Sequence, residues 1–379
     1  MTNREMLGLY IHIPFCKEKC HYCDFFSFRG KAELMVPYVE ALIHEIDSFN
    51  NEDLDIDTIY IGGGTPSILM LSSIESIMAH VRAAFRIKDN AEITIEVNPG
   101  TVKFDALKAY SAMGINRLSM GAQSFNEKHL KRLGRIHLAK DISSTVKAAR
   151  AAGFENISLD LIYGLPDETL EELITDIKAG IELGVDHLSL YGLIIEEGTQ
   201  FFAEYEKGTL NLPAEELLLQ MRETGTILLE KAGFRHYEIS NYGKKGFFSK
   251  HNLIYWQNKN YLGLGADASS YWQGERYKNM DSISGYIAEK KENKSSKLDC
   301  YKIGNKEAIE EEILLGLRLI DGINIYEFKK RYDIDLLEMY KEPIRLLKEE
   351  GCLKIDNGQL YLTLRGLAIS NYCLGMFLC

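Results

Sequence analysis

The sequence predicts an α/β protein built on a parallel sheet, and two observations indicate this. Over the N-terminal half, short β-rich runs alternate with amphipathic segments; the expected strands are 7–13, 58–64, 92–98, 117–123, 157–164 and 187–194. Segments between them, such as 36–49 and 170–183, repeat apolar residues at helical spacing. Because parallel neighbours need helical crossovers, six βα units in series favour a parallel sheet. The sheet can remain open and doubly wound, or curve into a partial barrel.

Polar and conformationally unusual residues stand where these strands end. In both closures the carboxyl ends of the strands form the site of chemistry. The residues at those ends are Cys16, 62–66, 96–99, Gln123, Asp160, Gly164 and Tyr191. Their common position predicts a single functional site along one rim of the sheet.

Composition excludes several classes of protein. The chain has 379 residues, 46% of them hydrophobic, and a formal net charge of -11. That acidity disfavours binding to nucleic acid or to anionic membranes. No apolar run approaches the roughly 18 residues of a transmembrane helix, and the first residues do not resemble a signal peptide. The cysteines are not spaced as a disulfide framework, so we expect a cytoplasmic protein.

The C-terminal part of the chain has a different pattern. We divide the chain into a core at 1–210, an extension at 211–290 that is rich in glycine and aromatic residues, and a module at 291–379. The polar stretch 288–299 is interpreted as a linker. Helices are expected at 306–319, 325–332 and 336–350, followed by a hairpin that turns at Asn357-Gly358. This is a winged-helix outline, and its acidity favours a lid or docking module over DNA binding.

Three of the chain's seven cysteines, Cys16, Cys20 and Cys23, form a Cys-x3-Cys-x2-Cys motif. Thiolates of this kind hold zinc or iron–sulfur clusters. Structural zinc sites have four ligands, and no second cysteine pair is present; His21 stands awkwardly between two ligands. A four-iron cluster on three thiolates leaves one iron open, so we predict a [4Fe-4S] cluster, with zinc and free thiols as alternatives. The remaining cysteines are interpreted as structural or incidental thiols: Cys300, Cys352, Cys373 and Cys379.

The stretch "YIHIPFCKEKCHYC" resembles the signature of the radical S-adenosylmethionine (SAM) family. More narrowly, nearly the whole chain is similar to the oxygen-independent coproporphyrinogen dehydrogenases and their relatives. The resemblance implies a partial (β/α)6 barrel of TIM type with a C-terminal helical, winged-helix-like domain. It also implies that the open iron binds the amino and carboxylate groups of SAM. An electron from the cluster then cleaves SAM to methionine and a 5′-deoxyadenosyl radical.

The resemblance also implies a set of SAM contacts. Residue chemistry alone leaves "IGGGTPS" either a tight turn or a ligand loop, and leaves Glu96 either a solvated strand-end carboxylate or a ligand. Asp160 within an apolar strand needs a partner, which ribose hydroxyls or Arg135 would supply. By similarity to the family, the SAM-binding residues are Tyr10, Tyr22, Gly63, Gly64, Thr65, Glu96, Gln123, Arg135 and Asp160. Tyr22 is also among the aromatic neighbours expected to shield the cluster.

Two departures from the dehydrogenase pattern resemble the family's heme chaperone branch. Phe25 stands where those enzymes have a fourth cysteine, and the segment before the first strand is short. The motif "HNLIYW", 251–256, is similar to that branch's heme motif. It implies that His251 binds heme iron, with Tyr255 and Trp256 packing on the porphyrin; chemistry alone favours a surface or hydrogen-bonded histidine instead. Nearby lysines, at 244, 245 and 250, are expected to meet the propionates.

The function implied by the resemblance is therefore heme binding and heme transfer to an acceptor protein. It depends on the [4Fe-4S] cluster, SAM and a reducing electron donor, without coproporphyrinogen dehydrogenase activity. The alternative is an oxygen-independent coproporphyrinogen III dehydrogenase, an oxidoreductase of the same family.

Overall fold

The computed structural model describes residues 6–50 and 53–378, and a sheet of twelve strands forms its centre. Cys379 lies outside the described residues. Six strands run parallel in the order β1–β4–β5–β6–β7–β8. Their bounds are Gly8–Ile13, Asp55–Gly63, Arg86–Val97, Arg117–Gln123, Asn156–Tyr163 and His187–Gly192. The sheet does not close on itself, since β1 pairs with β11 and β8 with β10 at the outer edges. The predicted partial (β/α)6 barrel is confirmed.

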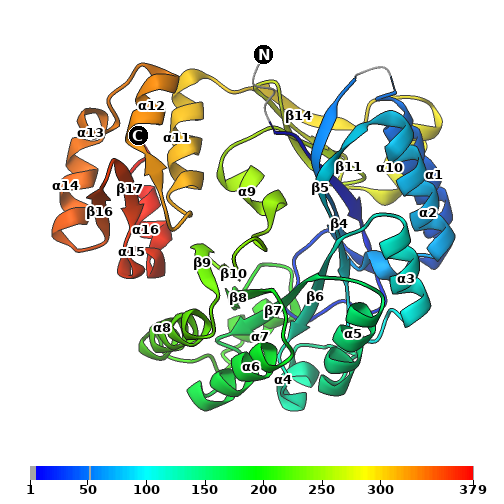
Figure 1. Cartoon of the computed structure of the whole chain (residues 1–379), viewed down its shortest axis with the longest axis horizontal. Coiled ribbons are helices and arrows are strands. Elements are labelled where there is room, and N and C mark those ends of the chain that lie inside the picture. The colour runs from blue at the N-terminus through cyan, green and yellow to red at the C-terminus, as the bar shows by residue number, and fades with distance from the viewer. Residues whose placement is uncertain (1–5, 51–52, 379) are drawn as a thin grey trace.

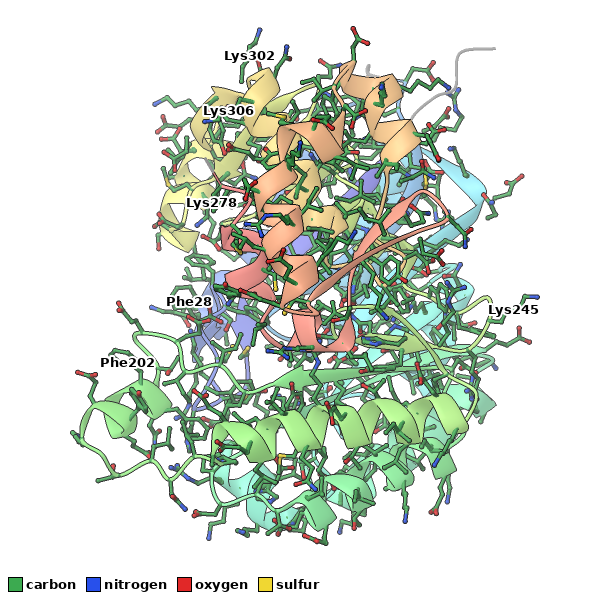
Figure 2. All side chains as sticks on the ribbon, turned by 90° about the vertical axis from the view of Figure 1, so that its left-hand side faces the viewer. Phe28, Phe202, Lys245, Lys278, Lys302 and Lys306 are labelled. Carbon is green, nitrogen blue, oxygen red and sulfur yellow. The ribbon has the colours of Figure 1, made fainter. Side chains whose placement is uncertain are left out.

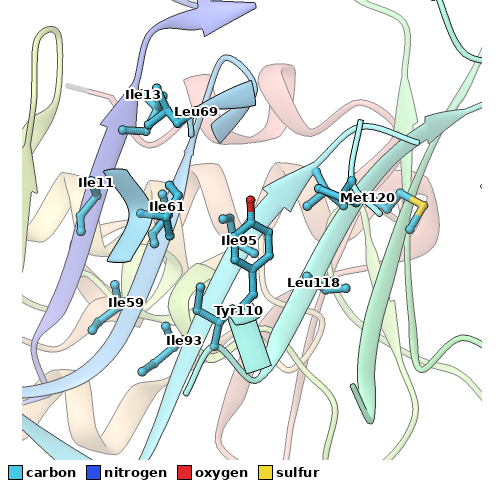
Figure 3. Close-up of a cluster of buried hydrophobic side chains, with 14 of the residues drawn as sticks. Ile11, Ile13, Ile59, Ile61, Leu69, Ile93, Ile95, Tyr110, Leu118 and Met120 are labelled. Atoms are coloured by element: carbon cyan, nitrogen blue, oxygen red, sulfur yellow. The ribbon is translucent and has the colours of Figure 1, made fainter. Parts of the chain in front are cut away.

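Helices cover the outer face of these strands (Figure 1). They are α1 (Ala32–Asp47), α2 (Leu71–Ala84), α3 (Phe104–Ala112), α4 (Glu127–Arg132), α5 (Ala139–Ala151) and α6 (Leu170–Glu182). Alternate strand residues such as Ile59, Ile61, Ile93 and Ile95 are buried beneath them (Figure 3). Because side chains alternate along a strand, the residues between these positions face the inside of the barrel. Those inward positions hold the polar residues of the site.

Residues after the sixth strand extend the sheet at both edges. On the β1 side are β11 (Tyr261–Leu264), β12 (Ser269–Trp272), β13 (Glu275–Asn279) and β14 (Lys297–Lys302), with α10 (Ile283–Lys291) beside α1. On the β8 side are β9 (Arg235–Glu238) and β10 (Asn241–Gly243), after α7 (Gln200–Glu206) and α8 (Glu215–Lys231). The linker expected at 288–299 is wrong, because this stretch contains the end of α10 and the start of β14.

The C-terminal module has a hydrophobic core of its own. It contains α11 (Asn305–Gly316), β15 (Ile323–Asn324), α12 (Ile325–Tyr332), α13 (Leu336–Met339), α14 (Lys341–Glu349), β16 (Leu353–Asp356), β17 (Gln359–Leu362), α15 (Leu364–Ala368) and α16 (Ser370–Gly375). The helix expected at 336–350 is interrupted at Tyr340, and α15 and α16 were not expected. The predicted hairpin forms: Asn357 and Gly358 have φ of 47° and 74°, both positive, as a two-residue primed turn requires. None of the helices that the structure describes is long and apolar enough to cross a membrane.

Glu45 on α1 joins the extension to the barrel. Its buried carboxylate accepts hydrogen bonds from the Gly265 amide (2.7 Å), Asn279 Nδ2 (2.9 Å) and the Tyr286 hydroxyl (2.6 Å). Lys290 Nζ lies 3.0 Å from the same carboxylate. Four donors compensate this carboxylate for its lost hydration. Its removal leaves the largely buried Lys290 cation without its counter-charge, and the Gly265 amide and the Tyr286 hydroxyl lose this acceptor, whereas Asn279 Nδ2 keeps the Gly265 carbonyl at 3.0 Å.

We therefore predict that Glu45→Ala lowers the free energy of unfolding by roughly 3 kcal/mol, the usual cost of breaking a buried ion pair. Urea unfolding measures the change. The matched control is Glu40→Ala on the same helix, because Glu40 is exposed. The control should shift stability by less than about 0.5 kcal/mol. Equal unfolding midpoints for the two variants would contradict the role of Glu45.

Candidate functional site

The cysteine motif lies on a loop that follows β1. The chain passes through β2 (Phe15–Cys16), turns through the other two cysteines and returns in β3 (Phe28–Arg29), which pairs with β2. All three cysteines are free and half-buried. Lys19 Nζ donates to the carbonyls of Phe25 and Ser27 at 3.1 Å, which closes the loop on itself.

His12 holds the end of this loop, a role that the sequence analysis missed. Its Nε2 lies 2.8 Å from the Phe26 carbonyl, and its Nδ1 lies 2.9 Å from the Tyr10 hydroxyl. Burial lowers the pKa of His12, so the ring is neutral, with Nε2–H donating to Phe26 and Nδ1 accepting from Tyr10. The sequence did contain a signal for this role. His12 and Tyr10 are two residues apart on β1, so both side chains lie on the inner face of the strand.

One cavity of about 120 Å³ gathers the predicted cluster and SAM residues. It is lined by all three cysteines and by every predicted SAM contact except Tyr10, namely Tyr22, Gly63, Gly64, Thr65, Glu96, Gln123, Arg135 and Asp160. Tyr10 lines an adjoining cavity of about 420 Å³ that shares Phe25, Gly63 and Glu96. The structure thus brings these residues together, while their individual roles stay predictions.

Two donors point at cysteine sulfur atoms. Arg135 Nη1 lies 3.4 Å from Cys20 Sγ, and the Thr65 hydroxyl lies 3.6 Å from Cys16 Sγ. Hydrogen bonds to sulfur tune the potential of an iron–sulfur cluster. Arg135 is therefore not the hydrogen-bond partner that the sequence suggested for Asp160; Asp160 instead accepts from the Ser189 hydroxyl at 2.8 Å.

The arrangement suits a cluster better than a single ion. Among the described residues, no group of three histidine, cysteine or acidic side chains converges on one metal ion. Three cysteines around a common cavity, with N–H and O–H donors at two sulfurs, fit a cluster whose thiolates bind different irons. Burial raises the pKa of Cys23 to about 11, so the free thiol keeps a proton that metal binding would release.

Glu96, at the end of β5, is held in place before any ligand binds. It accepts from the Tyr60 hydroxyl at 2.8 Å and from the Gly63 amide at 3.0 Å. Burial raises the pKa of Glu96 to about 7, against the opposing effect of these hydrogen bonds. A carboxylate in this setting can pair with a ligand cation such as an ammonium group.

The glycines after β4 are required by the fold itself. A Cβ on Gly64 would lie 2.6 Å from the Phe15 carbonyl oxygen, which is closer than real Cβ contacts. The backbone on either side is bonded to the cysteine strand, since the Gly64 and Thr65 amides donate to Ile13 and Phe15 at 2.9 and 2.8 Å. Gly64 therefore permits the close approach of the β4 loop to the strand that carries Cys16.

His251 lies on α9 (Lys250–Trp256), which packs against the amino-terminal end of the lumen. Its ring is buried, with Nδ1 at 2.7 Å from the Thr58 hydroxyl and Nε2 at 2.8 Å from the Tyr255 hydroxyl. Burial lowers the pKa of His251 to about 3, so the ring is neutral. Both ring nitrogens are engaged, and coordination of heme iron by His251 requires one of these bonds to break. The prediction that it binds heme is not tested by this arrangement.

The lysines expected near the propionates lie elsewhere. Lys250 donates to the Asn90 carbonyl at 3.2 Å, and Lys244 Nζ lies 5.3 Å from the centre of the Phe234 ring. Lys245 projects from the outer edge of the molecule (Figure 2). None of the three lines the cavities described around the cysteine loop and the lumen.

Family models match two parts of the chain: the radical SAM superfamily over residues 10–179, and the HemN C-terminal domain over residues 303–369. The heme chaperone HemW of Lactococcus lactis is 37% identical over 97% of this chain and 96% of its own length. The chain belongs to the HemW family.

Other relatives in this family are similarly close. HemW of Bacillus subtilis is 37% identical over 98% of this chain and 99% of its own. HemW of Escherichia coli is 42% identical over 71% of each chain. The solved structure of the Escherichia coli coproporphyrinogen III oxidase HemN, a radical SAM enzyme, superposes with a TM-score of 0.85 at 23% identity, covering 98% of this chain and 90% of HemN. That similarity establishes the shared fold.

We predict that Gly64→Ala reduces cluster content at least severalfold, because the added Cβ displaces the cysteine strand and not only a ligand. Iron and acid-labile sulfide per chain, after anaerobic purification, measure the effect. Gly375→Ala is the matched control, since its Cβ would meet no described atom within 4 Å. Full cluster content in Gly64→Ala would show that the close approach at Phe15 is dispensable.

Proposed function

We propose that this protein is a heme chaperone of the cytoplasm, which binds heme and transfers it to an acceptor protein. The observation that carries the proposal is the full-length similarity to HemW proteins together with a cavity that three cysteines share with the predicted SAM residues. Phe25, which takes the place of a fourth cysteine, is 63% exposed at the lip of that cavity. The acceptor and the reducing partner are proteins that the surface of this chain must contact.

In the proposed site, Cys16, Cys20 and Cys23 hold a [4Fe-4S] cluster. Arg135 and Thr65 donate hydrogen bonds to two of the thiolates. The cluster, when bound, supplies an electron and an open iron position for SAM. The chain's own part is to orient SAM through the glycine loop and Glu96, and to shield the cluster with Tyr22.

Heme is proposed to bind at the segment 251–256. Asn252 and Tyr255 of this segment line two cavities that both reach Glu96 and Phe25, which supports a heme site next to the predicted SAM residues. His251 lies behind Tyr255 and supports the segment through its two hydrogen bonds. In this proposal the heme site and the cluster site are separated only by side chains that line both, such as Phe25 and Glu96.

We expect anaerobically purified protein to contain about four iron and four sulfide per chain, the content of a [4Fe-4S] cluster. Changing Cys16, Cys20 or Cys23 to Ala should abolish the broad cluster absorption, because two thiolates do not retain a cluster. Cys300→Ala is the matched control, since Cys300 is exposed and lies outside the site. One tightly bound zinc without sulfide would overturn the assignment.

His251→Ala is expected to weaken heme binding at least tenfold, about 1.4 kcal/mol, because the variant loses either the iron ligand or the support of Tyr255. Heme titration followed at the Soret band measures it, and heme transfer to an acceptor should fail as well. Cluster absorption should persist, since the cysteines lie apart from α9. The matched control is His80→Ala, whose half-exposed ring pairs with Asp47.

Wild-type protein should not oxidise coproporphyrinogen under strict anaerobiosis. Turnover of coproporphyrinogen by the wild type would assign the chain to the dehydrogenases. If His251→Ala binds heme with unchanged affinity and an unchanged spectrum, the heme site does not lie on α9.

A further inference from the structure

A third cavity of about 400 Å³ continues from the SAM site into the lumen of the barrel. It shares Glu96, Ser119, Gln123 and Asp160 with the cysteine-lined cavity. It then extends toward the amino-terminal ends of the strands, where Arg117 and other polar residues form its floor. Arg117 is the one lysine or arginine among the described residues that line it.

Arg117 is a buried cation that forms no close ion pair with a described residue. Its side chain is 2% exposed, and its Nε makes no hydrogen bond. Among the described residues, no acidic side chain forms an ion pair with it. An arginine in this condition is only partly compensated for its lost hydration, so an anion that paired with it directly would stabilise it.

Glu96 and Asp160 are near enough for the charge of Arg117 to oppose the rise that burial causes in the pKa of each, but neither forms an ion pair with it. Glu96 is held by Tyr60 and Gly63, and Asp160 is held by Ser189. The strand register explains the separation, because Glu96 pairs with Ser119 on β6, which lies two residues further along the strand than Arg117. The other acids lining the cavity, Asp24 and Glu196, lie on loops beyond the strands.

The residues that pair with Arg117 on the two adjacent strands also have buried polar atoms without a hydrogen bond. Thr94 is the register partner of Arg117 on β5, and its buried hydroxyl lacks a hydrogen bond. Asn156, the partner on β7, has an unpaired Oδ1. Neither Thr94 nor Asn156 lines the cavity, and the Asn156 oxygen is an acceptor, so Arg117 is the cationic donor that the cavity offers at this depth. A guanidinium suits a carboxylate.

The mouth of the cavity is apolar. Ile194 is 67% exposed and Phe25 is 63% exposed, and both line the same cavity as Arg117. Leu193 and Ile162 add apolar surface to the same lining. An apolar entrance above a cationic floor fits a flat apolar ligand that carries carboxylates on one edge.

We propose that the lumen of the barrel binds a tetrapyrrole propionate, and that Arg117 is the residue that recognises it. This inference rests on the proposed function and specifies how heme is oriented: the propionate edge enters first, beside Asn252 at the end of the same cavity. The binding step exchanges hydration of the carboxylate for an ion pair with Arg117 and makes no covalent change. SAM also carries a carboxylate, and the experiment separates the two sources.

The test compares hemin with hemin dimethyl ester, which has no free carboxylate, on the full-length protein holding its cluster. Wild type should bind hemin at least tenfold more tightly than the ester. Arg117→Gln should lose this preference by weakening hemin while leaving the ester unchanged, and Arg117→Lys should keep part of it. The matched control is Arg345→Gln, because Arg345 is half-exposed on α14 and pairs with Glu342 and Glu349.

Several results would overturn the inference. Equal affinities of the wild type for hemin and the ester would overturn it. This comparison needs no variant, so it remains valid even if Arg117→Gln does not fold. Weaker SAM binding in Arg117→Gln with the hemin preference intact would assign the arginine to SAM. A parallel loss of hemin and ester binding would make Arg117 structural. If wild type binds neither compound, the proposed function itself fails.

Discussion

Polar and charged side chains on the inner face of the parallel strands impose the constraint on which the rest of this structure depends. Burying such groups is unfavourable unless each finds a partner. Glu96 and Asp160 have their hydrogen bonds within the barrel, and His187 and His251 are neutral with both nitrogens engaged. The apolar outer faces of the same strands, packed under helices, offset this burial. Only an inner face built in this way can present ionisable groups to a ligand away from water.

The elements outside the barrel serve the same end. Gly265 and Ala266, which follow β11, donate to Glu45 and to the Tyr38 hydroxyl, and Tyr38 donates to the carbonyl of His12. His12 in turn contacts the carbonyl of Phe26 at the end of the cysteine loop. A continuous series of hydrogen bonds therefore joins the extension of the sheet to the cluster loop. The role of the extension is to fix the loop, as well as to carry α9.

Local pattern was sufficient for the parallel sheet, whereas the choice of a barrel over an open sheet and the set of SAM contacts came from the family resemblance. Short β-rich runs between segments of helical spacing predicted all six parallel strands, and the strand ends predicted a shared rim. Predictions failed where the deciding partner lies far along the chain. The polar stretch 288–299 forms a helix end and a strand because β13 offers β14 an edge to pair with. Asp160 accepts a hydrogen bond from Ser189 and not from Arg135, and the sequence around Asp160 does not distinguish between these two partners.

The state of His251 bears on how a carrier releases its cargo. Its bonds to Thr58 and Tyr255 stabilise a conformation in which the imidazole does not face a cavity. If His251 binds iron, the competent conformation of α9 is a minor one, and apparent affinity falls by its population. A ligand residue that returns to two hydrogen bonds after heme leaves favours release over retention. Such a property suits a protein that passes heme to an acceptor better than it suits a site that retains its cofactor.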